Sequence, residues 1–352
     1  MISKKHFISI GLALLIFIFG LFPNAVLQYY SAGLYPFIAR ILRAVSGLFP
    51  FALGDILYAC LLFFALIKSY LYFKKRKSLP KTNPFAIPLQ LFHILLVLYI
   101  TFKILWGLNY SRPSISTQLG VGNAKYTVKE LVILGNFFID RLNDLQSKTG
   151  PQQNYTLAAL REQATLAYQQ MALQNPLFNY PAVSLKPALN SWAISEIGIE
   201  GYYNPLSGEA NINQKLPSWV LPFVVCHEIA HQLGVAREDE ANLVGYLTAV
   251  HSKDLHFQYS ANYNMLRYVL YEIGFKSPKD YELLYKKLNP QLIANFKAES
   301  EFWRQYNSQM SSYMTIAFDK FLKLNNQPQG IESYQNIVIW LWNYHKAEVL
   351  TK

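Results

Sequence analysis

The sequence predicts a mainly α-helical protein with a small β-sheet, an α+β fold that begins with three transmembrane helices. The chain of 352 residues is 52% hydrophobic and only 15% charged, a low charged fraction for a soluble protein. Three apolar stretches, at about 7–27, 50–72 and 87–108, each have the roughly 20 residues with which a helix crosses a bilayer. Helical periodicity dominates the remainder. We therefore divide the chain into a membrane anchor, 1–108, and a second domain, 109–352.

Charge is concentrated in the predicted anchor. Residues 1–108 hold 11 Lys and Arg but one acid, Asp55, which gives +10 of the chain's net charge of +11. Basic residues mark the cytoplasmic ends of spans, so Lys4, Lys5 and the cluster at 74–81 are predicted to lie inside. The basic balance therefore indicates membrane topology, and no nucleic-acid partner is expected.

The orientation of the chain follows from these ends. The loop at 28–49 is expected outside and partly in the membrane interface, and three spans from an inside N-terminus place 109–352 outside the cytoplasm. The first stretch could instead be a signal peptide, but Pro-Asn-Ala at 23–25 matches a small-x-small cleavage site poorly. An uncleaved anchor is favoured, and the second domain lies outside in both cases.

Four residues carry predictions about contacts within the chain. Asp55 and Lys103 lie at similar depths in the second and third spans, which predicts a structural ion pair. Cys60 lies in the second span and Cys226 in the second domain, so no disulfide is expected. A catalytic thiol at Cys226 is an alternative to a small buried residue there, and the buried residue is favoured.

The second domain reads as helical on both sides of a β region. Thr127 and Glu130 have the spacing of a capping box before an apolar-periodic run at 131–145. Alternation at 191–195 and turn residues within 201–213 predict strands. The other predicted helices span 156–174, 259–274, 278–288, 291–305, 307–325 and 331–346.

Residues 227–231 read His-Glu-Ile-Ala-His. On a helix, positions i and i+4 share a face, so His227 and His231 can direct two imidazoles at one metal ion. Glu228, beside them, is placed to take a proton from a water on the metal rather than to bind the metal. Such a pattern also occurs by chance on ordinary helix surfaces, but the apolar run at 219–226 predicts a buried helix whose histidines need partners. Neutral imidazole and carboxylate favour Zn²⁺.

The third ligand is predicted in the helix that follows, at 238–250. Glu238 shares a face with small residues, which let two helices approach closely, whereas Glu240 shares a packing stripe with leucine and valine. Glu238 is therefore favoured. Glu240 stays open because a tight hairpin would place it more nearly opposite the second histidine, and Asp239 is a weaker candidate. Asn242, one turn after Glu238, could hydrogen-bond a ligating histidine.

The two motifs together resemble those of the gluzincin metallopeptidases. The second motif, Glu-x-x-Ala-Asn at 238–242, is similar to that of the HtpX and CAAX-protease membrane peptidases and of the ImmA/IrrE peptidases. The resemblance implies that Glu238 is the third zinc ligand and that Asn242 takes the place of the Asp or Asn of those families. Six residues separate His231 from Glu238, fewer than is usual there.

Over nearly its full length, the chain resembles an uncharacterised family of bacterial membrane proteins of unknown function, known mainly from Bacteroidetes. This resemblance implies a multi-pass protein of the bacterial cell (inner) membrane, and it brings no activity with it. The matching stretches are 29–31, 35–36, 50–55, 106–110 with Arg112, 201–213 and the two motifs above.

The expected function is that of a membrane-anchored, gluzincin-like zinc metallohydrolase, and more specifically a peptidase that acts on a peptide or protein. His227, His231 and Glu238 would bind Zn²⁺, and Glu228 would act as general base and then return the proton to the leaving amine. Two alternatives are less favoured. An intramembrane protease needs a longer apolar run before His227, and a non-catalytic envelope protein stabilised by zinc leaves Glu228 without a role.

Two features of substrate binding stay open in the sequence. The segment 209–213 resembles, by position, the edge strand that holds extended peptide beside the active-site helix of gluzincins, and a plain structural hairpin fits equally well. Four side chains, Tyr202, Tyr203, His251 and Tyr268, could stabilise an oxyanion, and the sequence does not select among them.

Overall fold

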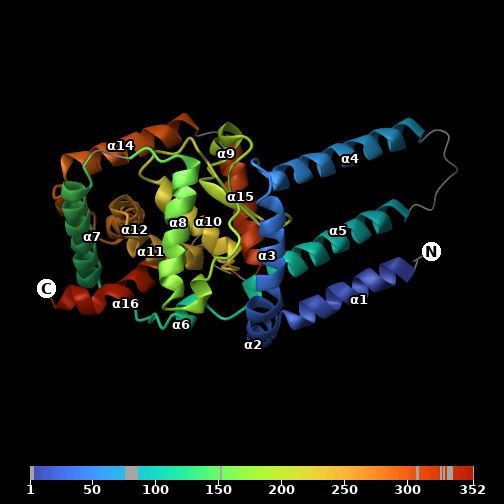
Figure 1. Ribbon diagram of the computed structural model, residues 1–352, viewed down its shortest axis with the longest axis horizontal. Coiled ribbons are helices and arrows are strands. Elements are labelled where there is room, and N and C mark those ends of the chain that lie inside the picture. The colour runs from blue at the N-terminus through green and yellow to red at the C-terminus, as the bar shows by residue number, and fades with distance from the viewer. Residues whose placement is uncertain are drawn as a thin grey trace.

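The chain is mainly helical with one small sheet, as predicted. The computed structural model describes residues 4–75, 86–150, 153–306, 309–325, 327, 330 and 336–351. Three long helices, α1 (Lys4–Phe19), α4 (Leu53–Lys75) and α5 (Ala86–Leu105), extend from one side of the part that the other elements build (Figure 1). The start of α1, the end of α4 and the start of α5 lie at the far ends of these helices.

Two of the three predicted spans are confirmed as helices long and apolar enough to cross a membrane. They are Leu53–Lys74 and Ile87–Leu105, and no residue in their most apolar windows is buried. The predicted span at 7–27 differs. α1 ends at Phe19, and the helical segment Pro23–Ser46 leaves it at an angle of 99°, so a third span exists only if this bent pair is counted as one.

The bend has a local cause. Proline lacks the N–H that would continue a helix, and Pro23 starts a new one. The elements that follow the bend are α2 (Pro23–Ala25), the π-helix η1 (Val26–Leu34) and α3 (Tyr35–Ser46).

α3 has two unlike faces. One face buries Tyr35, Arg43 and two small residues, and the other exposes Phe37 and Ile41. In Figure 1 the helix lies across the direction of α4 and α5. The exposed apolar face is compatible with the prediction that part of 28–49 lies in a membrane interface.

The predicted ion pair between Asp55 and Lys103 is wrong. Asp55 stands in the first turn of α4 and accepts a hydrogen bond from the Tyr202 hydroxyl at 2.6 Å. Lys103 donates to Asn325 Oδ1 at 3.1 Å. Both charged groups lie at the ends of their helices, where the rest of the chain reaches them, and depth along a span does not reveal such contacts.

The helices of the second domain follow the prediction closely. The capping box is confirmed, because the Glu130 N–H donates to Thr127 Oγ1 and the Thr127 N–H donates to Glu130 Oε2. It starts α7 (Val128–Thr149), which packs along α12 (Leu255–Lys276). The predicted starts at 307 and 331 lie outside the described residues. The other helices are η2 (Gly107–Ser111), α6 (Ile115–Gln118), α8 (Leu157–Ala172), η3 (Pro176–Phe178), α13 (Pro278–Tyr285), α14 (Pro290–Gln305), α15 (Gln309–Leu324) and α16 (Asn336–Leu350).

The β region predicted before the motif is confirmed in part. β2 (Gly201–Asn204) and β3 (Glu209–Ile212) form an antiparallel hairpin, and β1 (Leu185–Pro187), which the sequence did not indicate, pairs parallel with β3. The strand order is β1-β3-β2, so the segment at 209–213 is central and not an edge strand.

The strand predicted at 191–195 is wrong. These residues form the helix α9 (Ser191–Glu196). The Asn190 side chain accepts from the Ala193 N–H at 3.0 Å and thereby caps the helix. The cap outweighs the alternating pattern, which is short.

The two motif helices lie in the interior of the second domain. α10 (Leu221–Gln232) and α11 (Glu238–Val250) pack on each other and on α12, and β2 and β3 lie against α10. Every residue of α10 except His227 is buried, including Cys226. Cys60 is exposed on α4, and both cysteines are free thiols.

Candidate metal centre

A sharp turn brings α11 back alongside α10. Gly234, with a φ of +83°, ends α10, because the left-handed backbone region is open to glycine and strained for other residues. The Val235 N–H then donates to the Ala230 carbonyl at 3.1 Å and closes the turn. Gly245 lies where the helices cross, since a Cβ there would be 3.0 Å from the His227 backbone nitrogen. The small-residue face predicted for α11 is thus the face on which α10 packs.

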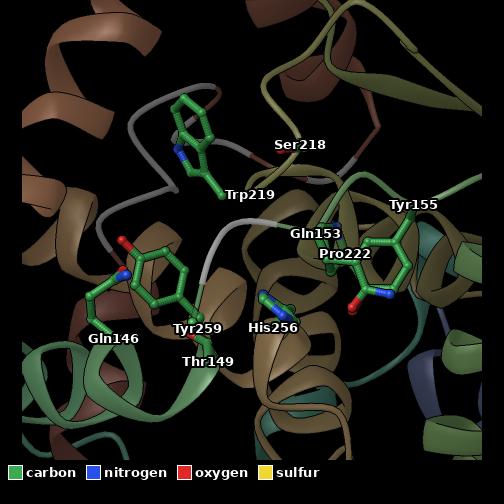
Figure 2. Close-up of a pocket in the computed structure, with 10 residues that line it drawn as sticks. Gln146, Thr149, Gln153, Tyr155, Ser218, Trp219, Pro222, His256 and Tyr259 are labelled. Atoms are coloured by element: carbon green, nitrogen blue, oxygen red, sulfur yellow. The ribbon is translucent and has the colours of Figure 1, made fainter.

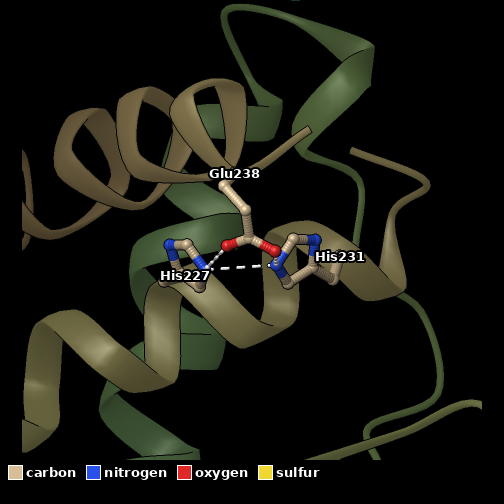
Figure 3. Close-up of side chains that lie close together, drawn as sticks. All are labelled: His227, His231 and Glu238. Carbon is tan, nitrogen blue, oxygen red and sulfur yellow. Dashed lines mark hydrogen bonds and ion pairs between the residues drawn. The ribbon is translucent and has the colours of Figure 1, made fainter. Parts of the chain in front are cut away.

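The crossing brings together three side chains, His227, His231 and Glu238, which we call the triad (Figure 3). The two histidine Nε2 atoms are 3.1 Å apart. The Glu238 carboxylate oxygens lie 3.3 Å from His227 Nε2 and 3.7 Å from His231 Nε2. Ligands at about 2.0–2.1 Å from a tetrahedral zinc ion are separated by roughly 3.3–3.4 Å. The two histidine nitrogens and the two Glu238 oxygens, each nearest to a different histidine, therefore lie close to this spacing, and the triad could hold a metal ion.

The Nδ1 atoms of the two histidines also affect metal binding. His231 Nδ1 lies 2.6 Å from the Val235 carbonyl oxygen, a contact that favours a proton on Nδ1 and leaves the Nε2 lone pair for a metal. His227 Nδ1 is buried without a hydrogen-bond partner among the described residues. Asn242, predicted to hydrogen-bond a histidine, lies close enough to influence the pKa of His227, and its amide donates to the Tyr268 hydroxyl at 3.3 Å.

The other two acids of the second motif have different partners. Glu240 Oε1 accepts from the Ile115 N–H at 3.1 Å and so fastens the start of α6 to α11. Asp239 accepts from the Asn336 side chain at 2.8 Å, at the start of α16. Of the three acids that the sequence left as candidates, Glu238 is the one that reaches the two histidines.

Glu228 is buried beside the histidines. It is 3% exposed, and its Oε2 has no hydrogen-bond partner in the part of the chain that the structure describes. Gly201 of β2 lies directly against its carboxyl group, since a Cβ at this position would be 2.7 Å from Glu228 Oε1. A side chain at this position would therefore displace the Glu228 carboxyl group. A buried carboxyl oxygen without a partner is costly, so packing alone does not account for Glu228 at this position.

The charges of the site favour a cation. Burial disfavours a charge on His231, but the carboxylates of Glu238 and Glu228 outweigh this effect and raise its pKa to about 9. Burial also opposes the charge of Glu238, and the two histidines outweigh it and hold the pKa of Glu238 well below its usual range. Burial lowers the pKa of His227 and raises that of Glu228 to about 8. An ionised Glu238 thus stabilises positive charge at the histidines, whether that charge is a proton or a metal ion.

The four side chains that could stabilise an oxyanion have different surroundings in the structure. The Tyr202 and Tyr203 hydroxyls are hydrogen-bonded toward the membrane-proximal helices, and His251 lies at the far end of α11. Tyr268 of α12 shares a hydrogen bond with Asn242. Burial raises the pKa of Tyr268 to about 12, and the carboxylates of Glu200 and Glu238 add to this effect. Of the four, Tyr268 is the one whose hydroxyl is hydrogen-bonded to α11, at Asn242 one turn after Glu238.

Residues directly after α5 contact the motif helix α10 beside the triad. The sequence did not predict these contacts. Trp106, directly after α5, donates from Nε1 to the His231 carbonyl at 3.1 Å, and its ring lies 6.0 Å from the His231 ring. Tyr110 packs edge-on against Trp106, and burial together with the charge of Glu238 raises the pKa of Tyr110 well above its usual range. The stretch 106–110 stood out only through the family resemblance, because no local pattern predicts a contact 125 residues away.

The first membrane loop binds the same end of α10. The Tyr35 hydroxyl donates to the Gln232 carbonyl at 3.0 Å, and Arg43 Nη1 donates to the same oxygen at 2.7 Å. These bonds satisfy a carbonyl that a helix C-terminus leaves unpaired, and the positive Arg43 complements the helix dipole. The anchor thus fixes the end of the helix that carries His231.

A hollow lies at the other end of α10 (Figure 2). Trp219, Pro222, His256 and Tyr259 are among the residues that line it. The lining includes one imidazole and no carboxylate or thiol. This hollow therefore offers no second set of metal ligands, and it holds none of the predicted site residues.

Zinc affinity should distinguish the acidic candidates. Loss of a residue that hydrogen-bonds a metal ligand typically lowers metal affinity by about 10–100-fold. Glu238→Ala should lower zinc affinity by more than this, because it removes a ligand atom. Asn242→Ala should fall within that range. Glu240→Ala should leave the affinity unchanged and lower the melting temperature, since it breaks the bond to Ile115. Titration against a chromophoric chelator measures all three, and metal loss in Glu240→Ala with retention in Glu238→Ala would show that the third ligand is misassigned.

Comparisons with known proteins identify a family without an assigned role. A family model described as a protein of unknown function, DUF3810, matches residues 30–342. No curated protein and no solved structure matches the chain. The matched region runs from the first membrane loop to α16 and contains the whole triad.

Proposed function

The chain belongs to the DUF3810 family of unknown function, and we propose that it is a membrane-anchored, gluzincin-like zinc hydrolase that cleaves peptide bonds. The triad carries this proposal: its three ligand atoms lie within 4.8 Å of one another. Two imidazoles and one carboxylate leave a fourth tetrahedral position for water or substrate, as in catalytic rather than structural zinc sites.

Glu228 supplies the acid–base chemistry of the proposed reaction. Zinc held by the triad would act as a Lewis acid and lower the pKa of a water molecule toward about 7. Glu228 accepts one proton of the attacking water and returns it to the nitrogen of the leaving amine, so the peptide bond breaks into an amine and a carboxylic acid that keeps the water's second hydrogen. Close contact with Gly201 holds the carboxyl group in place for both transfers. The Tyr268 and Tyr110 hydroxyls are the candidate donors to the carbonyl oxygen.

The sheet favours a peptide as substrate. β2 is an edge strand, it lies against α10, and its Gly201 contacts Glu228. An exposed strand edge binds an extended peptide by main-chain hydrogen bonds. We therefore assign to β2 the role that the sequence left open for 209–213.

The direct test uses the full chain, because Tyr35, Arg43 and Trp106 of the anchor hold the end of α10. Detergent-purified protein should contain about one zinc per chain, should hydrolyse casein or a peptide library, and should lose this activity with a zinc chelator. Bound zinc without hydrolysis of any peptide would favour the non-catalytic envelope protein stabilised by metal. Absence of zinc would refute both functions.

We place α4 and α5 across the bacterial cell membrane, with the triad outside the cytoplasm. The basic cluster at 74–81, which lies partly outside the described residues, follows the end of α4. That end lies away from the second domain (Figure 1). Because basic residues stay inside, the second domain lies outside.

Reporter fusions should reveal this topology. Alkaline phosphatase, which is active only outside the cytoplasm, should be active when fused after residue 112 or at the C-terminus and inactive when fused after residue 77. The basic cluster around residue 77 is the reason. A reporter active only in the cytoplasm, fused at the same points, should give the reverse pattern. Phosphatase activity after residue 77 with none at the C-terminus would invert the topology.

A further inference from the structure

α15 (Gln309–Leu324) carries an exposed apolar stripe. Met310, Tyr313, Ala317 and Leu324 recur at spacings of three, four and seven residues, so they lie along one side of the helix. Phe321 lies at the border of the same side and is 37% exposed. Tyr313 is 67% exposed and Leu324 is 83% exposed. Large apolar side chains aligned on one face mark an interaction surface rather than an ordinary water-facing surface.

Contacts of α15 fix its place beside the end of a predicted span. The Phe321 ring lies 5.9 Å from the Phe102 ring near the end of α5 and 6.2 Å from the Tyr110 ring. Directly after α15, Asn325 accepts from Lys103 of α5. α15 therefore lies at the level where α5 leaves its apolar stretch, and Figure 1 shows it across the direction of α4 and α5.

The composition of α15 suits a lipid headgroup layer. Lys320 and Lys323 lie along one border of the stripe, and Asp319, which pairs with Lys323 at 2.7 Å, is the one acid of the helix. Tyrosine and lysine at the border of an apolar face are typical of helices that lie in a membrane interface, where the net positive charge attracts anionic lipids.

α3 offers an independent parallel at the same end of the spans. It also lies across α4 and α5, buries one face and exposes Phe37, Ile41 and Val45 on the other. Two amphipathic helices with exposed apolar faces thus lie where the predicted spans meet the second domain. A bilayer around α4 and α5 would cover the exposed apolar faces of both α3 and α15. A protein partner of α15 would account for the exposed face of α15 alone.

We propose that α15 is an interfacial helix whose stripe of Met310, Tyr313, Ala317 and Leu324 lies in the bilayer, with phospholipid as its occupant. This inference depends on α4 and α5 spanning a membrane and not on the metal chemistry. It places the triad next to the membrane surface, because Phe321 packs on Tyr110 beside the triad.

Quenching by brominated lipid tests the proposal on the full chain in lipid nanodiscs. Tyr313→Cys and Leu324→Cys, each made in a Cys60→Ala background, carry a polarity-sensitive fluorophore on the stripe. Brominated lipid should quench these two labels to about the same degree as a label on Cys60 of the unaltered protein. Cys60 is exposed on α4. Buried Cys226 should stay unlabelled.

Two matched positions serve as controls. Thr315→Cys lies on the opposite side of α15, and Phe275→Cys replaces an aromatic residue that is 82% exposed on α12. Neither label should be quenched. If the stripe labels behave like these controls while Cys60 is quenched, α15 does not lie in lipid. If stripe cysteines instead form disulfide-linked dimers at native protein concentration, the occupant is a second copy of the chain. An unquenched Cys60 label would overturn the membrane placement of α4 itself.

Discussion

Removing either imidazole of the triad should abolish zinc binding. His227→Ala or His231→Ala leaves two of the three ligand atoms. Losing a ligand should lower zinc affinity more than losing a residue that only hydrogen-bonds a ligand, so affinity should fall by more than about 100-fold. Full-length protein purified without added metal should then contain almost no zinc by elemental analysis. The effect should be of similar size for both histidines, because their Nε2 atoms lie 3.1 Å apart at the same site.

His251→Ala is the matched control for this experiment. It removes an imidazole from the end of α11, where His251 Nδ1 bonds to the Leu247 carbonyl, and it leaves the triad untouched. This variant should keep its zinc, and circular dichroism should show that all three variants remain helical. Full zinc content in both triad variants would refute the metal site.

The part of the site that the sequence predicts is the part governed by local geometry. The i, i+4 spacing places His227 and His231 on one face of a helix, and the structure brings both to one point with Glu238. The choice of Glu238 over Glu240 followed from small residues on one face of 238–250. Gly245 shows why that argument holds, since it permits the close crossing of α10 and α11.

The features that the sequence did not predict are contacts between distant segments. The bond from Trp106 to the His231 carbonyl joins the end of a predicted span to the motif helix, and hydropathy carries no signal for it. Asp55 was paired with Lys103 by depth alone, but it binds Tyr202 of β2 instead. β1 is three residues long, too short for an alternating pattern to stand out.

These distant contacts make the anchor part of the site. The last turn of α10 receives bonds from Tyr35, Arg43 and Trp106, all of which precede the second domain in sequence. At the start of the central strand β3, the Glu209 carboxylate accepts from the backbone N–H groups of Leu53 and Gly54 at the start of α4. The membrane helices and the triad are thus joined through α10 and β3, and activity measurements belong on the full chain.

Glu228→Gln should abolish hydrolysis and leave zinc in place. The amide has the size of the carboxyl group and still fits against Gly201, but it cannot accept a proton from water. Loss of a general base typically costs about 10²–10⁴-fold in rate, so the turnover number should fall at least about 100-fold. Peptide hydrolysis by the full-length variant, measured together with its zinc content, gives the result. The Michaelis constant should change little, because Glu228 acts on the attacking water and not on substrate binding.

Glu162→Gln, an exposed change on α8, is the control for the loss of one carboxylate and should leave both activity and zinc unaltered. Glu228 has an unpartnered, buried oxygen, and burial raises its pKa to about 8, so near neutral pH its replacement by an uncharged amide should not weaken the folded state. An equal or higher melting temperature of Glu228→Gln, together with lost activity, is therefore expected and separates a catalytic role from a structural one. If Glu228→Gln lost its zinc or kept full activity, Glu228 would not be the general base. The metal would then serve the fold, as in the non-catalytic alternative.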